Sequence, residues 1–539
     1  MEYVDCDYSE GAGSGDAQLS WAQRFMWDAI AATGAVSAEW DMVFEREFPH
    51  PLPLEAALDL VRRFVLRHPV LRTAITLSPD GTPVQHVRAS GTVGVALFRG
   101  SYTGRDQLWG LIPDTTPAEP FVPVLYMAGA QAVRLAVAVS HFSTDGWGRQ
   151  LLKDDLLALP LEDTADVVPS TPSPIDLARF ESSEEGAAAE RKAMKFAGAR
   201  YASCLPTAWL RHRCPPEPVR FWYGELRSSA LLAAMDRLSR SKRVVRAGML
   251  NGSLAAVAAA RAGLAAATLF AISSNRFSPA WRDYPGPLAQ EAILHVPIKD
   301  TVVDTMRAAA AESMRSMQCA RYAPAAMKAL FEQAEWERGV CFDKLGSAIV
   351  VNLMAGETST SPAPTPTSTT FRWLRNTGNE NLAFYVDAAQ EGPEFVLQVR
   401  LDTTRMTRAE AEAWLRTVEW AIVASAERDV PAGEVRTHLA ALLGAADNGE
   451  GWAGEGHRLL MAGCEKVVRA ATGADEVHLE RDTCYVVNPK RATTPAEMHK
   501  AVMAALPDAQ PAVAPQWYVV VPAGLDRSRW SGLPAVSGR

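Results

Sequence analysis

One stretch in the first third of the chain constrains the fold more than any other. Residues 137–152 read VAVSHFSTDGWGRQLL, and the apolar run RLAVAVS at 134–140 leads into it. The run predicts a short buried strand, the Asp145-Gly146 dipeptide predicts a tight turn, and residues 148–159 predict a helix. A strand, a turn and a helix in this order hold one side chain fixed at a surface, and that side chain is His141.

The residue types in this turn fit proton transfer beside a developing negative charge. Histidine titrates near neutrality and can take a proton from a nucleophile. The Asp145 carboxylate can orient the turn by pairing with a distant arginine, and the amide of Gly146 lies near a helix start, which favours negative charge. Acyl transfer through a tetrahedral oxyanion requires a base beside such a partial positive charge. Taken alone, the pattern also fits a structural histidine and an ordinary turn.

The bulk composition is that of a globular protein and excludes some functions. At about 100–200 residues per domain, the 539 residues correspond to two to four domains. A net charge of −8 argues against a dedicated nucleic-acid binder. The longest apolar candidate, residues 252–272, is interrupted by Arg261, so we expect a helix running towards a strand and no membrane span.

The cysteines and the N-terminal residues favour a cytoplasmic protein. Seven cysteines are scattered without a CxxC pair, which predicts neither a disulfide framework nor a metal site. The N-terminal residues MEYVDCDYSEGAGSGD are acidic and lack the apolar segment of a secretory signal. We therefore expect a reduced, cytoplasmic protein that binds neither nucleic acid nor membrane.

Two linker-like stretches divide the chain into three predicted parts. PLEDTADVVPSTPSP at 160–174 is rich in Pro, Ser and Thr, and GAADNGEGWAGEG at 444–456 is rich in Gly. They predict an N-terminal lobe at 1–165, a second lobe at 166–445 and a C-terminal unit at 446–539. In the last part, the order helix, strand pair, helix and strand is enough for a small α/β unit.

The turn at 140–146 resembles the HHxxxDG motif of condensation domains from nonribosomal peptide synthetases. The wider chloramphenicol-acetyltransferase-like acyltransferase superfamily shares this motif. Its second, functional histidine falls on His141, its aspartate on Asp145 and its glycine on Gly146, while Ser140 replaces the first histidine. The residue that follows the motif is Trp147.

Further segments resemble this family in the expected order, and together they span about residues 15–430. In the segment at 273–290, Arg276 stands where the family has the arginine that pairs with the motif aspartate. Two segments depart from the family, with Phe25 for an arginine and Pro69 for a glutamate. The segments are LSWAQRFMW (19–27), RHPVLRT (67–73), SPIDLARFE (173–181) and SSNRF…YPGPLAQ (273–290).

The resemblance implies a fold and a division of roles within the motif. The implied fold is α/β, with two chloramphenicol-acetyltransferase-like lobes forming a V around a central tunnel. His141 and Gly146 are the implied catalytic residues, with His141 as base or positioner. The residues expected to hold the motif in shape are Ser140, Asp145, Trp147 and Arg276.

The implied reaction joins an acyl thioester to an amine or hydroxyl acceptor, as in natural-product and antibiotic biosynthesis. The chain shows no phosphopantetheine attachment motif and no intact adenylation core, so we expect no intrinsic cofactor. An acyl or peptidyl carrier protein would supply the phosphopantetheine thioester in trans to a free-standing condensation enzyme. The acceptor would be a small molecule, and the product an amide or an ester.

Three alternatives remain open at this point. The protein could be a related acyltransferase that uses coenzyme A directly. It could be a non-catalytic scaffold that kept the fold, because Ser140 and Phe25 depart from the motifs. It could also dehydrate or cyclise a tethered substrate.

The C-terminal residues 506–532 faintly resemble the small C-terminal subdomain of adenylate-forming enzymes. Leu533 stands where that family carries its lysine after Ser-Gly. We therefore expect this unit to contribute structure or docking rather than chemistry, and to pack on the second lobe.

Overall fold

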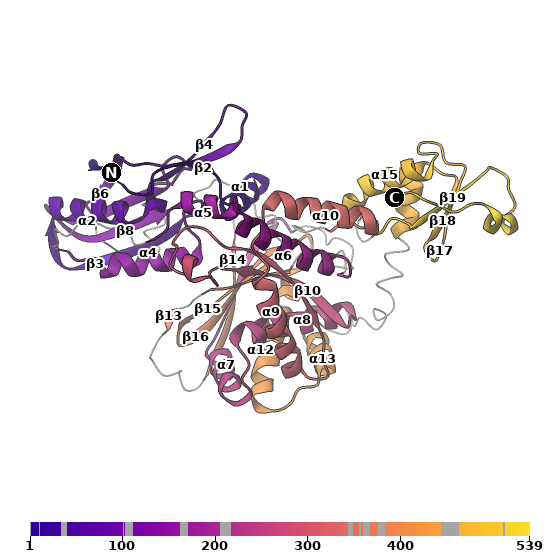
Figure 1. Cartoon of the computed structure of the whole chain (residues 1–539). Helices are drawn as coiled ribbons and strands as arrows, with labels where there is room; N and C mark the ends of the chain where they lie inside the picture. The colour runs from indigo at the N-terminus through magenta and orange to yellow at the C-terminus, as the bar shows by residue number, and fades with distance from the viewer. Residues whose placement is uncertain are drawn as a thin grey trace. The chain divides into compact units, whose positions relative to one another are not determined.

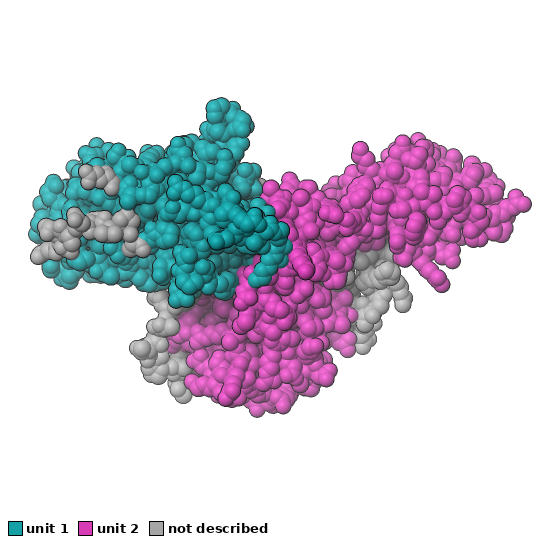
Figure 2. Space-filling model, in the orientation of Figure 1, with its two compact units in different colours: residues 1–193, 273–290, 320–324 teal, residues 194–272, 291–319, 325–539 magenta. Residues whose placement is uncertain are grey.

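The computed structural model forms two compact units (Figure 2). Unit 1 comprises residues 1–193, 273–290 and 320–324, and unit 2 comprises 194–272, 291–319 and 325–539. Both units combine helices with β-sheets, which confirms the predicted α/β class. The structure describes residues 2–9, 11–33, 40–100, 102, 112–161, 171–204, 217–342, 349–354, 357–358, 367–375, 383–443, 463–509 and 512–539.

Unit 1 is built on a five-stranded sheet in the order β1-β6-β7-β8-β3. Figure 1 labels β3, β6 and β8 of this sheet. Its strands are β1 (Glu2–Tyr8), β6 (Gly91–Phe98), β7 (Phe121–Ala128), β8 (Gln131–Val139) and β3 (Met42–Pro53). Because β8 is paired on both sides and buried from residue 135 onwards, its sequence is a continuous apolar run. The strand expected before His141 is therefore confirmed.

Two helices pack on the same face of this sheet. α2 (Leu54–Arg67) places Ala57, Leu60, Val61 and Phe64 at helical spacing, and each is fully buried. α4 (Gly146–Ala158) follows the turn after β8 and contributes to the same apolar core. Burying one such side chain contributes about 1.5–3 kcal/mol, so this core fixes the start of α4 relative to the end of β8.

A smaller sheet and two further helices complete the surroundings of the turn. The sheet has the order β2-β5-β4 and contains the hairpin expected at 73–87. These elements are β2 (Gly15–Gln18), β5 (Pro83–Val87), β4 (Thr73–Leu77), α1 (Trp21–Thr33) and α5 (Pro174–Glu181).

Unit 1 continues beyond the predicted lobe boundary at 165. The boundary and most of the predicted 160–174 linker fall on 162–170, outside the described residues. The compact unit extends to residue 193, within α6 (Glu184–Tyr201), and the chain returns to it at 273–290 and 320–324. Unit 1 is thus assembled from three separate parts of the chain.

Unit 2 contains an eight-stranded sheet in the order β11-β10-β12-β15-β16-β9-β14, with β13 paired to β15. Its strands are β11 (Gln290–Pro297), β10 (Ala266–Ser273), β12 (Ile349–Leu353), β15 (Phe384–Gly392), β16 (Glu394–Asp402), β9 (Phe221–Ser228), β14 (Thr369–Arg375) and β13 (Glu357–Thr358). Helices pack together beside this sheet, among them α7 (Ser229–Lys242), α8 (Arg246–Ala262), α9 (Val302–Met317), α12 (Arg408–Glu427) and α13 (Ala432–Leu443). The helix expected from the 252–272 run is the second half of α8, which leads into β10 as predicted.

The C-terminal part of unit 2 has a core of its own. Its strands are β17 (Glu476–Glu480), β18 (Thr483–Val487), β19 (Trp517–Val521) and β20 (Val536–Ser537), and α15 (Pro495–Ala505) and a helix at 463–472 pack on them. The expected order of helix, strand pair, helix and strand is confirmed, whereas the predicted linker at 444–456 lies outside the described residues.

The same part contacts the end of α10 (Pro324–Arg338). The Trp336 and His499 rings lie 4.7 Å apart, and Ala514 N donates to the carbonyl oxygen of Gly339 at 2.6 Å. Throughout the described ranges, none of the helices has the length and apolar character that crossing a membrane requires.

Candidate active site

The turn after β8 is closed by its own backbone. Ser140 is fully buried, and its N–H donates to the carbonyl oxygen of Pro120 at 2.8 Å. Its carbonyl oxygen accepts from the N–H groups of Ser143 and Thr144 at 2.8 and 3.1 Å. The Ser140 hydroxyl accepts from the N–H of Phe142 at 3.5 Å, so it caps the strand end inside the core.

His141 is the partly exposed residue of this turn, and its ring is held by the backbone. Nδ1 lies 2.9 Å from the carbonyl oxygen of Thr144. Because a carbonyl oxygen only accepts hydrogen bonds, the neutral ring carries its proton on Nδ1. Nε2 is then the nitrogen that can accept a proton, which is the arrangement a general base needs.

Asp145 is the N-cap of α4, and both oxygens of its carboxylate accept several hydrogen bonds. Its Oδ1 accepts from Gly148 N at 2.8 Å and from Arg276 Nη2 at 2.9 Å. Its Oδ2 accepts from Arg276 Nη1 at 2.9 Å, from Leu288 N at 2.9 Å and from Ala289 N at 3.0 Å. The carboxylate therefore ties the start of α4 to the 273–290 segment.

Arg276 is equally satisfied, so the expected pairing with Asp145 is present and fully buried. Besides its two bonds to Asp145, Nε donates to Tyr284 O, Nη1 to Ser274 O and Nη2 to Gly286 O. All five guanidinium N–H groups thus have partners. Burial raises the pKa of the Asp145 carboxyl, but the Arg276 charge and the hydrogen bonds outweigh it and hold that pKa below its usual value.

The glycines around Trp147 have different surroundings. Gly146 is exposed at the first position of α4, and a Cβ added there would meet open space. Trp147 is 45% exposed, so the core does not hold its ring. A Cβ added at Gly148 would lie 1.9 Å from the carbonyl oxygen of Pro285, in the 273–290 segment. Sequence reasoning missed Gly148, and the second glycine of DGWG was the available signal.

The LSWAQRFMW segment (19–27) also contacts the turn. Ser20 N donates to Gln23 Oε1 at 2.8 Å at the start of α1, and the Gln23 amide donates to the carbonyl oxygen of Phe142 at 3.4 Å. The Trp27 and Phe142 rings lie 5.5 Å apart. Three residues of the 19–27 motif therefore support the residue that follows His141.

Asn275 is a second residue that sequence reasoning missed. It adopts a left-handed backbone conformation with φ of 55°, which asparagine tolerates better than most residues. Its side-chain amide donates to the carbonyl oxygens of Leu288 and Ala320, both at 2.9 Å. It closes the 273–290 segment next to Arg276, and its position directly before that arginine was the only signal.

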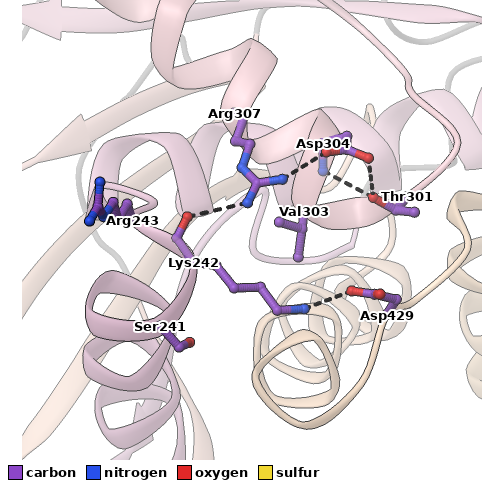
Figure 3. A pocket seen from close by; sticks show the side chains of 8 residues that line it. All are labelled: Ser241, Lys242, Arg243, Thr301, Val303, Asp304, Arg307 and Asp429. Atoms are coloured by element: carbon purple, nitrogen blue, oxygen red, sulfur yellow. Dashed lines mark hydrogen bonds and ion pairs between the residues drawn. The ribbon is translucent and has the colours of Figure 1, made fainter.

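A polar surface pocket of about 510 Å³ lies within unit 2 (Figure 3). Nζ of Lys242 lies 2.7 Å from Oδ1 of Asp429. Nη1 of Arg307 lies 2.9 Å from Oδ1 of Asp304. Thr301 caps the start of α9 by accepting from Asp304 N. Arg243 also lines the pocket, and none of the residues of the His141 turn does. Within the described ranges, no group of three His, Cys, Asp or Glu side chains is placed to bind a metal ion.

Solved structures share this architecture. A mutant starter condensation domain of rhizomide synthetase RzmA, in complex with C8-CoA, matches with a TM-score of 0.58 and 16% identity over 78% of this chain and 96% of that chain. The condensation domain for chain release from the enacyloxin polyketide synthase matches with a TM-score of 0.57 and 16% identity over 81% and 84%. SgcC5 from Streptomyces globisporus matches with a TM-score of 0.58 and 12% identity over 77% and 100%.

The chain therefore has the fold of the condensation domains found in nonribosomal peptide and polyketide synthesis. No protein-family model matches the sequence, and neither does any curated protein.

Proposed function

We propose that the protein is a condensation-type acyltransferase of natural-product biosynthesis. It would join an acyl group, delivered as a thioester on a carrier protein, to the amine or hydroxyl of a small acceptor. The observation that carries the proposal is the ring of His141, which is held through Nδ1 on a turn locked by Asp145 and Arg276. The fold shared with condensation domains supports it.

The chain's own residues suit each proton step of this reaction. Nε2 of His141 accepts the proton of the amine or hydroxyl as that group attacks the thioester carbonyl carbon. The N–H of Gly146, at the start of α4, favours the negative charge that develops on the carbonyl oxygen. His141 then returns the proton as the carbon–sulfur bond breaks and the thiol leaves. Holding both reactants at one site can lower the barrier by about 7–11 kcal/mol in favourable cases.

The donor would be a phosphopantetheine thioester that a partner carrier protein supplies. The partly exposed His141 and the exposed residues Gly146 and Trp147 fit a substrate that is delivered by a separate carrier protein. In this proposal the protein acts in the cytoplasm, without nucleic acid or membrane as ligand.

Coenzyme A is the second candidate donor, because the RzmA starter condensation domain was solved with C8-CoA. Intact-mass spectrometry of acyl-loaded carrier proteins, with parallel acyl-coenzyme A reactions, separates these possibilities. Loss of the acyl group from the carrier only with an acceptor and enzyme present supports carrier-dependent transfer. Loss of one water from a retained acyl group indicates dehydration or cyclisation. No change with any donor supports a scaffold.

The matched control for this assay is a histidine that the site does not use. His141→Ala should abolish the mass change, whereas His50→Ala, which alters an exposed residue of β3 in the same unit, should leave it intact. Equal loss in both variants would contradict the assignment of His141.

A further inference from the structure

A second buried carboxylate lies in unit 1 and has no part in the proposed chemistry. Glu181 ends α5 and is 8% exposed. Its Oε2 accepts from the backbone N–H of Trp21, the first residue of α1, at 2.8 Å. Its Oε1 lies 3.8 Å from Nη2 of Arg321, which is an ion pair but too long for a good hydrogen bond.

Arg321 is held by rings rather than by acceptors. Its guanidinium lies over the Phe180 ring at 4.3 Å and near the Trp281 ring at 5.4 Å. Among the described residues, neither its Nε nor its Nη2 has a hydrogen-bond partner, and the Tyr284 hydroxyl beside the same rings has none either. An ionised Glu181 is therefore poorly satisfied, since burying a charge is costly unless it is well hydrogen-bonded.

Glu181 connects to the His141 turn through α1. The Trp21 N–H that it accepts opens this helix, where N–H groups need an acceptor. One residue earlier, Ser20 is bonded to Gln23, and the Gln23 amide reaches the carbonyl oxygen of Phe142. Displacement of the first turn of α1 would therefore move the residue that follows His141.

Glu181 also connects to the Asp145–Arg276 pair through the 320–322 segment. The carbonyl oxygens that flank Arg321 hold the 273–290 segment at both ends, because Ala320 O accepts from Asn275 and Tyr322 O accepts from Gln290 at 2.8 Å. Arg276 lies in that segment. Glu181 thus stands between the two supports of the turn.

We propose that Glu181 is a positioning residue for His141, joining the start of α1 to the 320–322 segment, and that this junction is firmest when Glu181 is neutral. The proposal rests on the proposed acyl transfer for its effect on turnover, but its structural part is independent of any activity. The charged and titratable groups that face Glu181 are Arg321 and Tyr284, from the two segments packed against α5.

The direction of the pH effect follows from burial. Burial raises the pKa of Glu181 to about 7, although Arg321 and the Trp21 N–H oppose the shift. Any state in which the junction opens exposes Glu181 to water and lowers that pKa towards the ordinary range. A rise in pH through 7 therefore favours opening, because the state with the lower pKa gains when the proton leaves.

Hydrogen exchange of the wild-type protein, corrected for intrinsic rates, tests the structural part. We expect residues 20–27 and 140–148 to exchange faster at pH 8 than at pH 6, and Glu181→Gln to remove the difference. Glu312→Gln is the matched control, because Glu312 is a buried carboxylate of unit 2 paired with Arg200 and Arg315. Equal hydrogen-exchange rates at the two pH values in the wild type would overturn the proposal. This comparison does not require any variant to fold.

Turnover tests the functional part. Glu181→Ala removes the acceptor for Trp21 N–H, so kcat should fall by roughly tenfold with little change in KM. Glu181→Gln should restore kcat and abolish the decline in kcat that accompanies a rise in pH through 7. An unaltered pH profile in Glu181→Gln, or full kcat in Glu181→Ala, would overturn the proposal. If the wild-type protein shows no transfer activity, the proposed function is wrong. The hydrogen-exchange test of the junction still applies in that case.

Discussion

Asp145 with Arg276 and Glu181 with Arg321 are two buried carboxylate–arginine pairs of unit 1 with opposite degrees of satisfaction. In the first pair, every guanidinium N–H and both carboxylate oxygens have hydrogen-bond partners. In the second, the charges lie 3.8 Å apart and Glu181 accepts one backbone bond, from Trp21. Asp145 is therefore held in its charged form, whereas the pKa of Glu181, at about 7, lies close to neutral pH.

The difference shows that a buried acid stays charged when a close, hydrogen-bonded arginine and backbone N–H groups act on it together. Burial raises the pKa of both carboxyls. Around Asp145, the N–H groups of Gly148, Leu288 and Ala289 are already oriented by the fold, so together with Arg276 they reverse the effect. At Glu181 the opposing groups are too few, and the pKa stays raised to about 7.

Removal of the group that the satisfied pair holds should have the largest effect. His141→Ala should lower turnover by roughly 10²–10⁴-fold, the usual contribution of general acid–base catalysis. The thermal midpoint should change little, because His141 is partly exposed. Steady-state rates with a loaded carrier protein measure the first effect and thermal unfolding the second. Near-normal turnover would show that the Asp145–Arg276 pair supports a turn with no catalytic histidine.

Breaking the satisfied pair should cost stability as well as rate. Asp145→Ala leaves the Arg276 charge buried without a partner, so the free energy of unfolding should fall by about 3–5 kcal/mol. Asp155→Ala is the control on the same helix, because Asp155 is partly exposed and should cost less. Urea unfolding at neutral pH measures both. A smaller loss for Asp145→Ala than for Asp155→Ala would contradict the comparison.

The two carboxylates should also give opposite pH dependences of stability. The lowered pKa of Asp145 gives stability that is present above about pH 4 and is lost as the pH falls further. The raised pKa of Glu181 gives stability that is present below about pH 4.5 and is lost as the pH rises to about 7, by about 3 kcal/mol. Urea unfolding of the wild type and Glu181→Gln from pH 5 to 8 should show this slope only in the wild type. Parallel curves would remove the contrast.

The local pattern was enough to predict the elements of the site but not its pairing. Alternating and helical apolar spacing predicted β8, α4 and the 73–87 hairpin, because burial of one face decides those elements. Nothing local could predict that Arg276 reaches Asp145, since 131 positions separate them. The family resemblance predicted that pairing, and the structure shows it.

The second pair lay beyond both kinds of reasoning. The 173–181 segment was expected only as a resemblance, with no role for Glu181. Arg321 lies in no expected motif, because its place depends on how 320–324 returns to unit 1. The acceptor needs of Trp21 N–H depend in turn on where α1 begins. Such contacts are properties of the assembled unit and leave no periodic trace in the sequence.

The smallest predicted effect distinguishes Gly146, the glycine of the motif, from Gly148, which packs closely against Pro285. Gly148→Ala forces a methyl group against the carbonyl oxygen of Pro285 and pushes the Arg276 segment away from Asp145. It should lower the free energy of unfolding by about 1–3 kcal/mol and reduce turnover with it. In Gly146→Ala the added methyl group meets open space and the N–H is kept. The free energy of unfolding and the activation free energy of turnover should therefore each stay within about 0.5 kcal/mol of wild type. Urea unfolding and steady-state rates of the two variants, measured side by side, give the answer. If Gly146→Ala were the more damaging change, the surroundings of Gly146 would limit substitution in this turn more than the close contact of Gly148 with Pro285 does.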